Sequence, residues 1–380
     1  MHILISPNAF KNSLPANEVA DALREGILQS GFTGTVHCCP VGDGGDGTGN
    51  ILSRQLHAKE ICCKTVDALQ RPVDAAFGIT GNKTAIIELA DASGLRLLGP
   101  EEYKPLTANT KGTGKMIKAA LDAGAKKIIL CIGGSATVDG GTGLLQEMGI
   151  VFKNDINGAI GELPLGLADL ESIDAGSLDE RLQDVEITIL CDVKNKLLGK
   201  SGAAVVFGPQ KGANEYDVKF LEECLTRLDA VVFKTTQKRM SEMPHSGAAG
   251  GVAAALCAFC NAIAVDGISN FLEIINFNDQ IQNADWIITG EGAIDNQTLD
   301  GKAPYGVAVA AKKLNIPVIA VAGKIADEDS PELKKYFDEL ICINPPGISL
   351  QEAIGNTRKH LIETGKMIGL RLSGRKSART

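Results

Sequence analysis

Four segments of the chain combine small residues and charged or amide side chains directly after apolar, strand-like runs. They span residues 6–13, 41–48, 132–141 and 289–302. Ligands of open α/β sheets bind beyond the carboxyl ends of the strands, and small residues there let the backbone approach a ligand closely. Together the four segments indicate a site for an anionic ligand, with carboxylates to hold a metal ion or accept a proton.

The first two segments carry a lysine and a pair of acids. Lys11 lies between the opening strand-like run and a helical pattern, where it can reach an anionic substrate that the helix N-terminus also favours. Asp43 and Asp46 are three residues apart among glycines, which suits a hydrated metal ion or a proton acceptor. An ordinary polar loop and a plain tight turn are the alternative interpretations of these two segments.

The other two segments suit phosphate groups. In Ile132–Gly141, consecutive small residues expose backbone N–H groups to phosphate oxygens, and Asp139 can accept a proton or hold Mg²⁺. In the segment 289–302, glycines accompany Glu291, Asp295 and Lys302, a combination that suits an Mg²⁺–phosphate site. The sequences Asp43–Gly49 and Asp139–Gly143 echo each other, so two glycine-rich loops facing one ligand and a coincidence are both open.

The two common nucleotide-binding fingerprints do not fit this sequence. Gly199-Lys200-Ser201 has the ending of G-x-x-x-x-G-K-[ST], but Lys194 stands where that motif needs glycine. No G-x-G-x-x-G follows the first strand-like run, which disfavours a Rossmann dehydrogenase.

Composition favours a folded protein that acts on a small molecule. The chain has 380 residues, of which 44% are hydrophobic, so it can bury a sizeable core. A net charge of −8 argues against nucleic acid as a partner, because binding a phosphate backbone needs a basic face. The basic stretch 371–380 is the exception, and we expect it to be a solvated tail.

The same sequence predicts a cytoplasmic location. No apolar run reaches the length of a membrane span, and no secretory signal opens the chain. The ten cysteines suit a reducing compartment, since several lie in strand-like runs and the Cys257–Cys260 pair has no second pair nearby. We therefore expect neither a membrane nor a nucleic acid partner, and a homo-oligomer stays open.

Strand-like and helical patterns alternate along the chain, which predicts an α/β protein with a largely parallel sheet. The expected strands are His2–Ser6, Thr35–Val41, Thr84–Leu89, Lys127–Gly133, Glu186–Cys191, Trp286–Thr289, Pro317–Ala322 and Glu339–Ile343. The expected helices include Pro15–Ser30, Gly114–Ala123, Asp217–Phe233, Ala248–Phe259 and Tyr305–Leu314.

Several runs of the sequence resemble the bacterial glycerate kinase family. The resemblance extends nearly end to end and is carried by Ile132–Gly141, Cys191-Asp192-Val193, Val205–Gly212, Ser246–Gly251 and Thr289–Lys302. It implies transfer of the γ-phosphoryl group of ATP to D-glycerate. It also implies two α/β domains with the active site in the cleft between them. One is flavodoxin-like, with a parallel sheet built from both chain ends (1–56 and 285–380), and the other is an inserted mixed α/β domain (57–284).

On this basis we assign a role to each candidate residue. Lys11 and Lys302 bind anionic groups, and Asp43 or Asp192 receives the proton of the acceptor hydroxyl. Mg²⁺ is held by Glu291 and Asp295, directly or through water. The nucleotide is bound by the backbone or side chains of Gly133, Gly134, Ser135, Thr137, Asp139, Gly290 and Gly292.

Four positions depart from the pattern usual in that family. Asn8 replaces Asp in the first loop, Asp46 replaces Glu, Val138 replaces Asn and Ala293 replaces Arg. The loss of an Arg matters most for glycerate, because its guanidinium is a bidentate partner for a carboxylate. Three alternatives therefore stay open: a kinase for another small hydroxy or sugar acid, a ligand-binding protein without turnover, and a metal-dependent phosphatase. The sequence also leaves the product open between the 2- and 3-phosphate.

Overall fold

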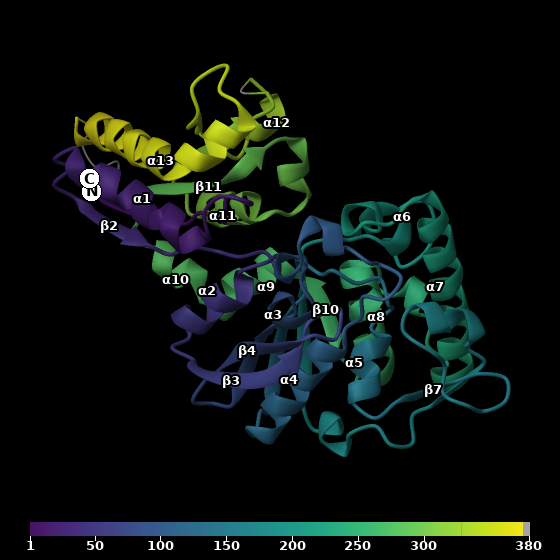
Figure 1. Ribbon diagram of the computed structural model, residues 1–380. Helices are drawn as coiled ribbons and strands as arrows, with labels where there is room; N and C mark the ends of the chain where they lie inside the picture. The colour runs from purple at the N-terminus through teal and green to yellow at the C-terminus, as the bar shows by residue number, and fades with distance from the viewer. Residues whose placement is uncertain (328, 375–380) are drawn as a thin grey trace. The chain divides into compact units, whose positions relative to one another are not determined.

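A computed structural model describes residues 1–327 and 329–374 and divides the chain into two compact units. Unit 1 combines both chain ends, Met1–Asp43 and Ile268–Thr380, whereas unit 2 is the continuous segment Gly44–Gly267. In Figure 1, the purple start and the yellow end of the chain both belong to unit 1. The sequence-based boundaries, at 56/57 and 284/285, stay a prediction.

Unit 1 is built around a five-stranded parallel sheet in the order β13-β12-β11-β1-β2. Numbered along the unit, this is the flavodoxin-like order 2-1-3-4-5, so the fold class expected from the sequence is confirmed. The inner strands β1 and β12 are largely buried on both faces, as parallel strands covered by helices should be. They are β1 (His2–Ile5), β2 (Thr35–Cys38), β11 (Trp286–Ile294), β12 (Val318–Ile325) and β13 (Glu339–Cys342).

The longest helices of unit 1, α1 and α13, lie side by side along its sheet (Figure 1). Leu23 and Ile27 of α1 are fully buried in one apolar cluster with Leu361 and Ile368 of α13. The helices of this unit are α1 (Ala16–Gln29), α9 (Gly267–Ile274), α10 (Phe277–Ile281), α11 (Ala303–Lys313), α12 (Pro331–Lys334) and α13 (Leu350–Ser373), with a 3₁₀ turn η8 (Asn296–Asp300).

Unit 2 contains a mixed six-stranded sheet in the order β10-β9-β6-β5-β4-β3. The first four strands in this order run parallel to one another, whereas β4 is antiparallel to β5 and β3 is antiparallel to β4. The strands are β3 (Lys59–Val66), β4 (Pro72–Ile79), β5 (Thr84–Glu88), β6 (Lys127–Cys131), β9 (Glu186–Cys191) and β10 (Ile263–Asp266), with a separate pair β7 (Val151–Lys153) and β8 (Ser172–Asp174).

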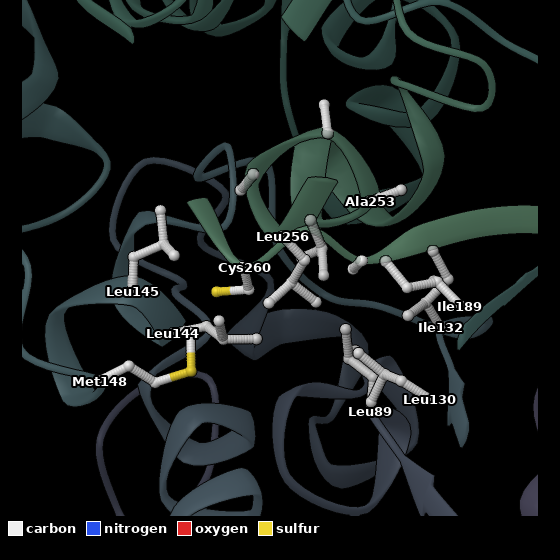
Figure 2. Close-up of a cluster of buried hydrophobic side chains, with 14 of the residues drawn as sticks. Leu89, Leu130, Ile132, Leu144, Leu145, Met148, Ile189, Ala253, Leu256 and Cys260 are labelled. Atoms are coloured by element: carbon white, nitrogen blue, oxygen red, sulfur yellow. The ribbon is translucent and has the colours of Figure 1, made fainter. Parts of the chain in front are cut away.

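Helices pack against this sheet to form a large apolar core. Figure 2 shows part of it, where Met148 lies beside Leu144 in one cluster with Leu256 and with Leu130 and Ile189 of the sheet. The α-helices of unit 2 are α2 (Thr48–Gln55), α3 (Ala90–Ser93), α4 (Lys111–Asp122), α5 (Thr142–Glu147), α6 (Ala203–Phe207), α7 (Glu215–Thr236) and α8 (Val252–Phe259). Its 3₁₀ turns are η1 (Leu95–Leu97), η2 (Pro100–Glu102), η3 (Leu165–Asp169), η4 (Glu180–Gln183), η5 (Pro209–Lys211), η6 (Met240–Glu242) and η7 (Ala248–Gly251).

One strand is longer than the sequence predicts. The expected strand ended at Thr289, whereas β11 continues to Ile294 and pairs with β12 as far as Ile325. Gly290 permits this pairing, because a Cβ at that position would overlap the Val321 carbonyl. The glycines that indicated a loop after the strand are therefore part of the strand itself.

The C-terminal stretch also differs from the expectation of a solvated tail. Arg371 is the last basic residue of α13 and forms an ion pair with Glu339 of β13. Residues 375–380 of that stretch lie outside the described residues. The pattern of α13 was missed because Gly365 and Gly369 interrupt its apolar stripe.

Candidate functional site

In unit 1, two candidate segments follow adjacent strands at the point where the strand order reverses. The loop 6–13 follows β1, and the end of β11 leads into η8. The Asn8 N–H donates to the Gly290 carbonyl (2.8 Å), which joins the loop to the strand. Open α/β sheets bind ligands at such a switch point, so this edge of the sheet is the first place to look for a site.

Glu291 is the buried acid of this edge. Its Oε1 accepts a hydrogen bond from Thr298 Oγ1 (2.8 Å) and lies 3.9 Å from Lys302 Nζ. Burial raises the pKa of Glu291 to about 7, and the charge of Asp43 adds to this rise, while Lys302, Thr298 and Lys11 oppose it. A cation beside this carboxylate would offset the cost of burying its charge.

We call the four charged residues Lys11, Asp43, Glu291 and Lys302 the Glu291 cluster. The electrostatic influence on Glu291 comes from the other three members, so the fold gathers four predicted site residues from distant parts of the sequence. Asp43 is also buried, and its Oδ2 accepts a hydrogen bond from Asn8 Nδ2 (2.9 Å). Asn8, a departure from the family pattern, thus holds one oxygen of Asp43.

The remaining predicted residues of unit 1 lie on the same segment. Gly292 follows Glu291, and a Cβ there would meet the Lys11 backbone nitrogen at 3.5 Å, an ordinary contact. Asp295 caps η8, because its Oδ1 accepts the Gln297 N–H at 2.9 Å. Ala293, the second departure, lies between them at an exposed position of β11.

The Asp295 carboxylate also lines a cavity of about 260 Å³ within unit 1. The other lining residues are Asn296, Gln297, Ala326, Asp327 and Leu333. Among the described residues, no group of three or more His, Cys, Asp or Glu side chains is arranged to hold a metal ion. Two carboxylates on one segment still match the donor set of Mg²⁺, which usually takes one or two carboxylates and completes its shell with water and phosphate oxygens.

In unit 2, the 133–141 loop follows β6 and packs tightly against the 44–47 loop. The Gly133 N–H donates to the Gly44 carbonyl (2.9 Å), and a Cβ on Gly133 would overlap the Gly45 backbone. The Gly133 amide, predicted to bind a phosphate, is therefore already committed to the protein. The amides of Gly134 and Ser135 donate none of the hydrogen bonds found within residues 1–327 and 329–374.

Asp139 is fully buried and holds the loop from inside. Its carboxylate accepts hydrogen bonds from the Thr110 amide (2.9 Å) and hydroxyl (2.7 Å) and from the amides of Gly141 and Gly143 (both 3.1 Å). Burial raises the pKa of Asp139 in spite of these four bonds. The side chain is thus engaged by protein donors, and its predicted part in nucleotide binding stays a prediction.

Lys211 was not among the predicted site residues, yet it lies at the centre of this loop. Its ammonium is buried and donates to Ser135 Oγ (2.8 Å) and to the Thr137 carbonyl (2.7 Å). Burial lowers the pKa of Lys211 to about 7, while the charges of Asp139 and Asp192 oppose this shift. The run Phe207–Gly212 had carried the family resemblance, and its lysine was the available signal.

Glu88 is a second residue that the sequence interpretation missed. It ends β5, and its two carboxylate oxygens accept the amides of Gly47 and Gly49, the latter at 3.0 Å. Burial, followed by a hydrogen bond with Asp46, raises its pKa to about 8. Asp46, another family departure, also forms an ion pair with Arg96 (2.8 Å). The only signal in the sequence that could have identified Glu88 was its position at the carboxyl end of an expected strand.

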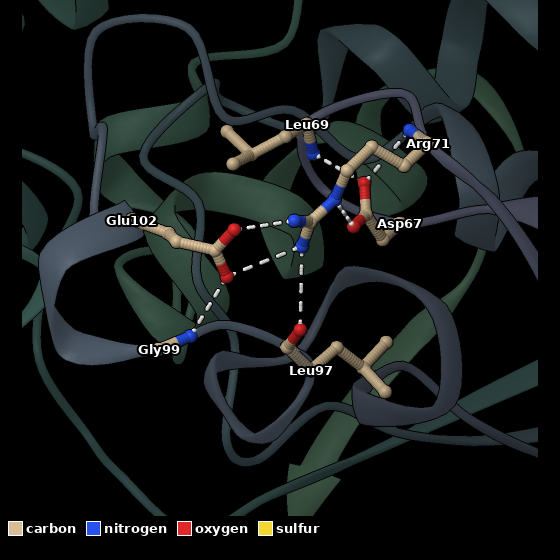
Figure 3. Close-up of polar contacts among 6 residues, drawn as sticks. All are labelled: Asp67, Leu69, Arg71, Leu97, Gly99 and Glu102. Carbon is tan, nitrogen blue, oxygen red and sulfur yellow. Dashed lines mark hydrogen bonds and ion pairs between the residues drawn. The ribbon is translucent and has the colours of Figure 1, made fainter.

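An arginine network braces the segment that covers the 133–141 loop. Figure 3 shows Arg71 bridging Asp67 to Glu102 and donating to the Leu97 carbonyl. This fixes residues 95–102, whose Leu95 amide in turn donates to the Gly134 carbonyl (2.9 Å). Ala136 packs in a small apolar cluster with Ala68, Leu98 and Ala108. The loop is therefore held by side chains from several elements of the unit.

The other predicted residues of unit 2 differ in exposure. Asp192 follows β9 and is exposed, although its charge acts on Lys211. Thr137 is fully buried. Val138, the last departure from the family pattern, is a core residue of the unit.

Comparison with known proteins identifies the family. The model of the glycerate kinase family matches residues 3–373. The chain belongs to the glycerate kinase family. The resemblance seen in the sequence is thereby confirmed, and membership of a kinase family implies ATP as the phosphoryl donor.

Individual relatives of this family member cover almost the whole chain. A glycerate 2-kinase from Escherichia coli (strain K12) is 41% identical over 374 residues, which are 98% of either chain. A glycerate kinase from Bacillus subtilis (strain 168) is 40% identical over 97% of either chain. A crystal structure of a glycerate kinase 2 from Salmonella typhimurium LT2 matches with a TM-score of 0.83, at 36% identity over 98% of either chain.

Two further findings concern the helices and the cysteines. None of the helices among the described residues is long and apolar enough to cross a membrane. All ten cysteines are free thiols.

Proposed function

We propose that this family member transfers the γ-phosphoryl group of ATP to D-glycerate, with the Glu291 cluster as its reacting centre. The observation that carries the proposal is the convergence of Lys11, Asp43 and Lys302 on Glu291 at the switch point of the sheet. Phosphoryl transfer needs little covalent chemistry from a protein. It needs positioned anions, neutralised charge and an acceptor for the hydroxyl proton.

Within the cluster, each residue has a distinct part. Lys11 is exposed and binds the carboxylate of glycerate or a phosphate oxygen, while Lys302 neutralises charge on the transferred group. Asp43 receives the proton of the attacking hydroxyl, and the hydrogen bond from Asn8 fixes its orientation. Asp192 is the alternative proton acceptor.

Mg²⁺ would be held by Glu291 and Asp295, directly or through water, together with phosphate oxygens of ATP. When bound, the ion neutralises charge that develops on the phosphate oxygens. The buried Glu291 carboxylate supports this assignment, because a cation would compensate its desolvation. Gly292 leaves the backbone beside Lys11 without a side chain, so that a phosphate can approach it, whereas Gly290 serves the pairing of β11 with β12.

The 133–141 loop is proposed to bind the phosphates of the nucleotide. The amides of Gly134 and Ser135 and the Ser135 hydroxyl are its donors, since the Gly133 amide is used by Gly44. Consecutive N–H groups of small residues form a concave anion site. Thr137 and Asp139 then act from within by holding the backbone of the loop.

The decisive experiment follows ADP production with ATP, Mg²⁺ and a panel of small hydroxy acids that includes both enantiomers of glycerate. Turnover with D-glycerate supports the proposal. Turnover only with another acid would mean that D-glycerate is not the substrate. Nucleotide binding without ADP production would indicate a non-catalytic protein. Release of phosphate in the absence of ATP would indicate a phosphatase.

We further propose the 2-phosphate as the product, which the similarity to the glycerate 2-kinase of Escherichia coli supports. Enolase dehydrates 2-phosphoglycerate and not 3-phosphoglycerate. Coupling the reaction to enolase without a mutase should therefore give phosphoenolpyruvate, and a signal that needs added mutase would contradict the 2-phosphate.

We also propose a cytoplasmic location, which the ten free thiols support because disulfides are rare in a reducing compartment. Expression with fractionation and a thiol count of the purified protein would test it, and disulfides in freshly isolated protein would argue against it.

A further inference from the structure

Lys211 is buried where a lysine is costly to place. Its side chain is 2% exposed, and it is surrounded by Ser135, also buried, and the fully buried Thr137. Lysine is almost never fully buried unless its charge is paired or hydrogen-bonded. Here two hydrogen bonds of 2.7 and 2.8 Å, together with the charges of Asp139 and Asp192, offset part of the cost of burial. Both hydrogen bonds go to the 133–141 loop.

The chemistry of an ammonium group fixes the direction of the bond to Ser135. An ammonium has three donors and no acceptor. In its charged form Lys211 therefore donates to Ser135 Oγ, and the hydroxyl hydrogen of Ser135 is left to donate to a different acceptor. The bond to the Thr137 carbonyl fixes the backbone two residues further along the same loop.

The same loop is closed from its other sides by backbone contacts. The Ala136 amide donates to the Ser93 carbonyl (2.8 Å), and a Cβ on Gly250 would overlap the Thr137 carbonyl oxygen. Residue 250 can therefore carry no side chain where it packs against the loop. Lys211 is the single buried cation that reaches the loop among the described residues, which sets it apart from these backbone contacts.

We propose that Lys211 is a positioning residue that orients the Ser135 hydroxyl and the adjacent amides toward a phosphate group of the nucleotide. This inference rests on the proposed nucleotide site in the 133–141 loop. Lys211 acts through Ser135 and the loop backbone, and it does not itself touch the reacting atoms.

A double-mutant cycle tests the proposal. The variants are Lys211→Met, Ser135→Ala and their combination, and the readouts are the Kd for ADP from calorimetry, the KM for ATP, the KM for glycerate and kcat. Losing one hydrogen bond to a charged phosphate should weaken ADP binding on the order of tenfold in Ser135→Ala. Lys211→Met should weaken it at least as much, and the double variant no more than Lys211→Met alone. The KM for glycerate should stay within twofold.

Two further variants serve as control and safeguard. Lys238→Met is the matched control, because Lys238 Nζ donates to the carbonyls of Cys257 and Ala258 and to Asn261, away from the loop. It should leave the ADP Kd unchanged. If Lys211→Met does not fold, Lys211→Gln, which keeps an N–H donor without the charge, replaces it in the cycle.

The outcomes separate two kinds of failure. If Ser135→Ala and Lys211→Met weaken ADP binding by independent factors that multiply in the double variant, the positioning role is wrong and the loop still binds nucleotide. If neither variant changes the ADP Kd, the proposed nucleotide site is itself wrong.

Discussion

The two units treat their buried charges differently. In unit 2, the Asp139 carboxylate and the Lys211 ammonium are surrounded by hydrogen-bond partners from the protein, four for Asp139 and two for Lys211. In unit 1, Glu291 has one hydroxyl donor and a lysine at 3.9 Å, and Lys11 is exposed. These buried charges of unit 2 stabilise the backbone of the 133–141 loop, whereas the charges of unit 1 have fewer protein partners and can interact with a ligand.

This difference separates two kinds of functional residue. A buried group whose hydrogen-bonding capacity is filled by the protein contributes through the structure that it maintains. A buried charged group with too few protein partners carries a desolvation cost, and this cost is offset only when a ligand binds beside it. Substitutions in the Glu291 cluster should therefore change turnover more than stability, and substitution of the fully hydrogen-bonded Asp139 should do the reverse.

The largest effect is expected for Asp43→Asn. Removal of a proton acceptor typically costs 10² to 10⁴ in rate, so kcat with D-glycerate should fall by about that factor. The amide is isosteric, so the thermal midpoint should shift by only a few degrees. Initial rates under saturating ATP and glycerate measure the first quantity and calorimetry the second.

Asp192→Asn is the matched control for this experiment, because the two acids are the competing candidates for one role. If Asp192→Asn loses the larger factor, the proton acceptor is Asp192. If both variants keep normal turnover, neither residue accepts the proton and the assignment to the Glu291 cluster is broken.

A smaller effect, on stability, is expected for Asp139→Asn. The amide cannot accept all four hydrogen bonds, and its NH₂ group would face the N–H donors of Gly141 or Gly143. Unsatisfied buried donors cost about 1–3 kcal/mol each, so the free energy of unfolding should fall by about 2–4 kcal/mol. Urea titration followed by circular dichroism measures it.

The control for Asp139→Asn is Asp174→Asn, which breaks an exposed ion pair with Lys153. Surface pairs contribute little to stability, so the urea midpoint should barely move. An equally small change for Asp139→Asn would show that its hydrogen bonds are not what holds the loop.

The sequence predicted the fold and the loops better than the parts that individual residues play. Strand patterns were enough to predict an α/β protein with a largely parallel sheet, because buried parallel strands are apolar on both faces, whereas the flavodoxin-like domain was predicted from the family resemblance. Glu291 and Lys302 were found because they lie close together in a glycine-rich segment. Lys211 and Glu88 were missed, since only the fold brings Lys211 to Ser135, 76 residues away in sequence. Nor could spacing reveal that Gly290 serves strand pairing.

The smallest effect concerns Glu88, whose oxygens hold the amides of Gly47 and Gly49. Burial raises its pKa from 4.5 to about 8, so between these values the folded protein binds more protons than the unfolded chain. Stability from this group is fully present below pH 4.5 and is lost as the pH rises through 8. Glu88→Gln cannot titrate, so its stability should decline less than that of the wild type, by about 1 kcal/mol for each pH unit between 5 and 8. Urea midpoints at each pH unit measure the slope.

Glu186→Gln, which changes an exposed acid paired with Lys127, is the control and should keep the wild-type slope. Parallel slopes for Glu88→Gln and the wild type would mean that Glu88 is ionised in the folded protein, with its charge held by the Gly47 and Gly49 amides, and would contradict the raised pKa.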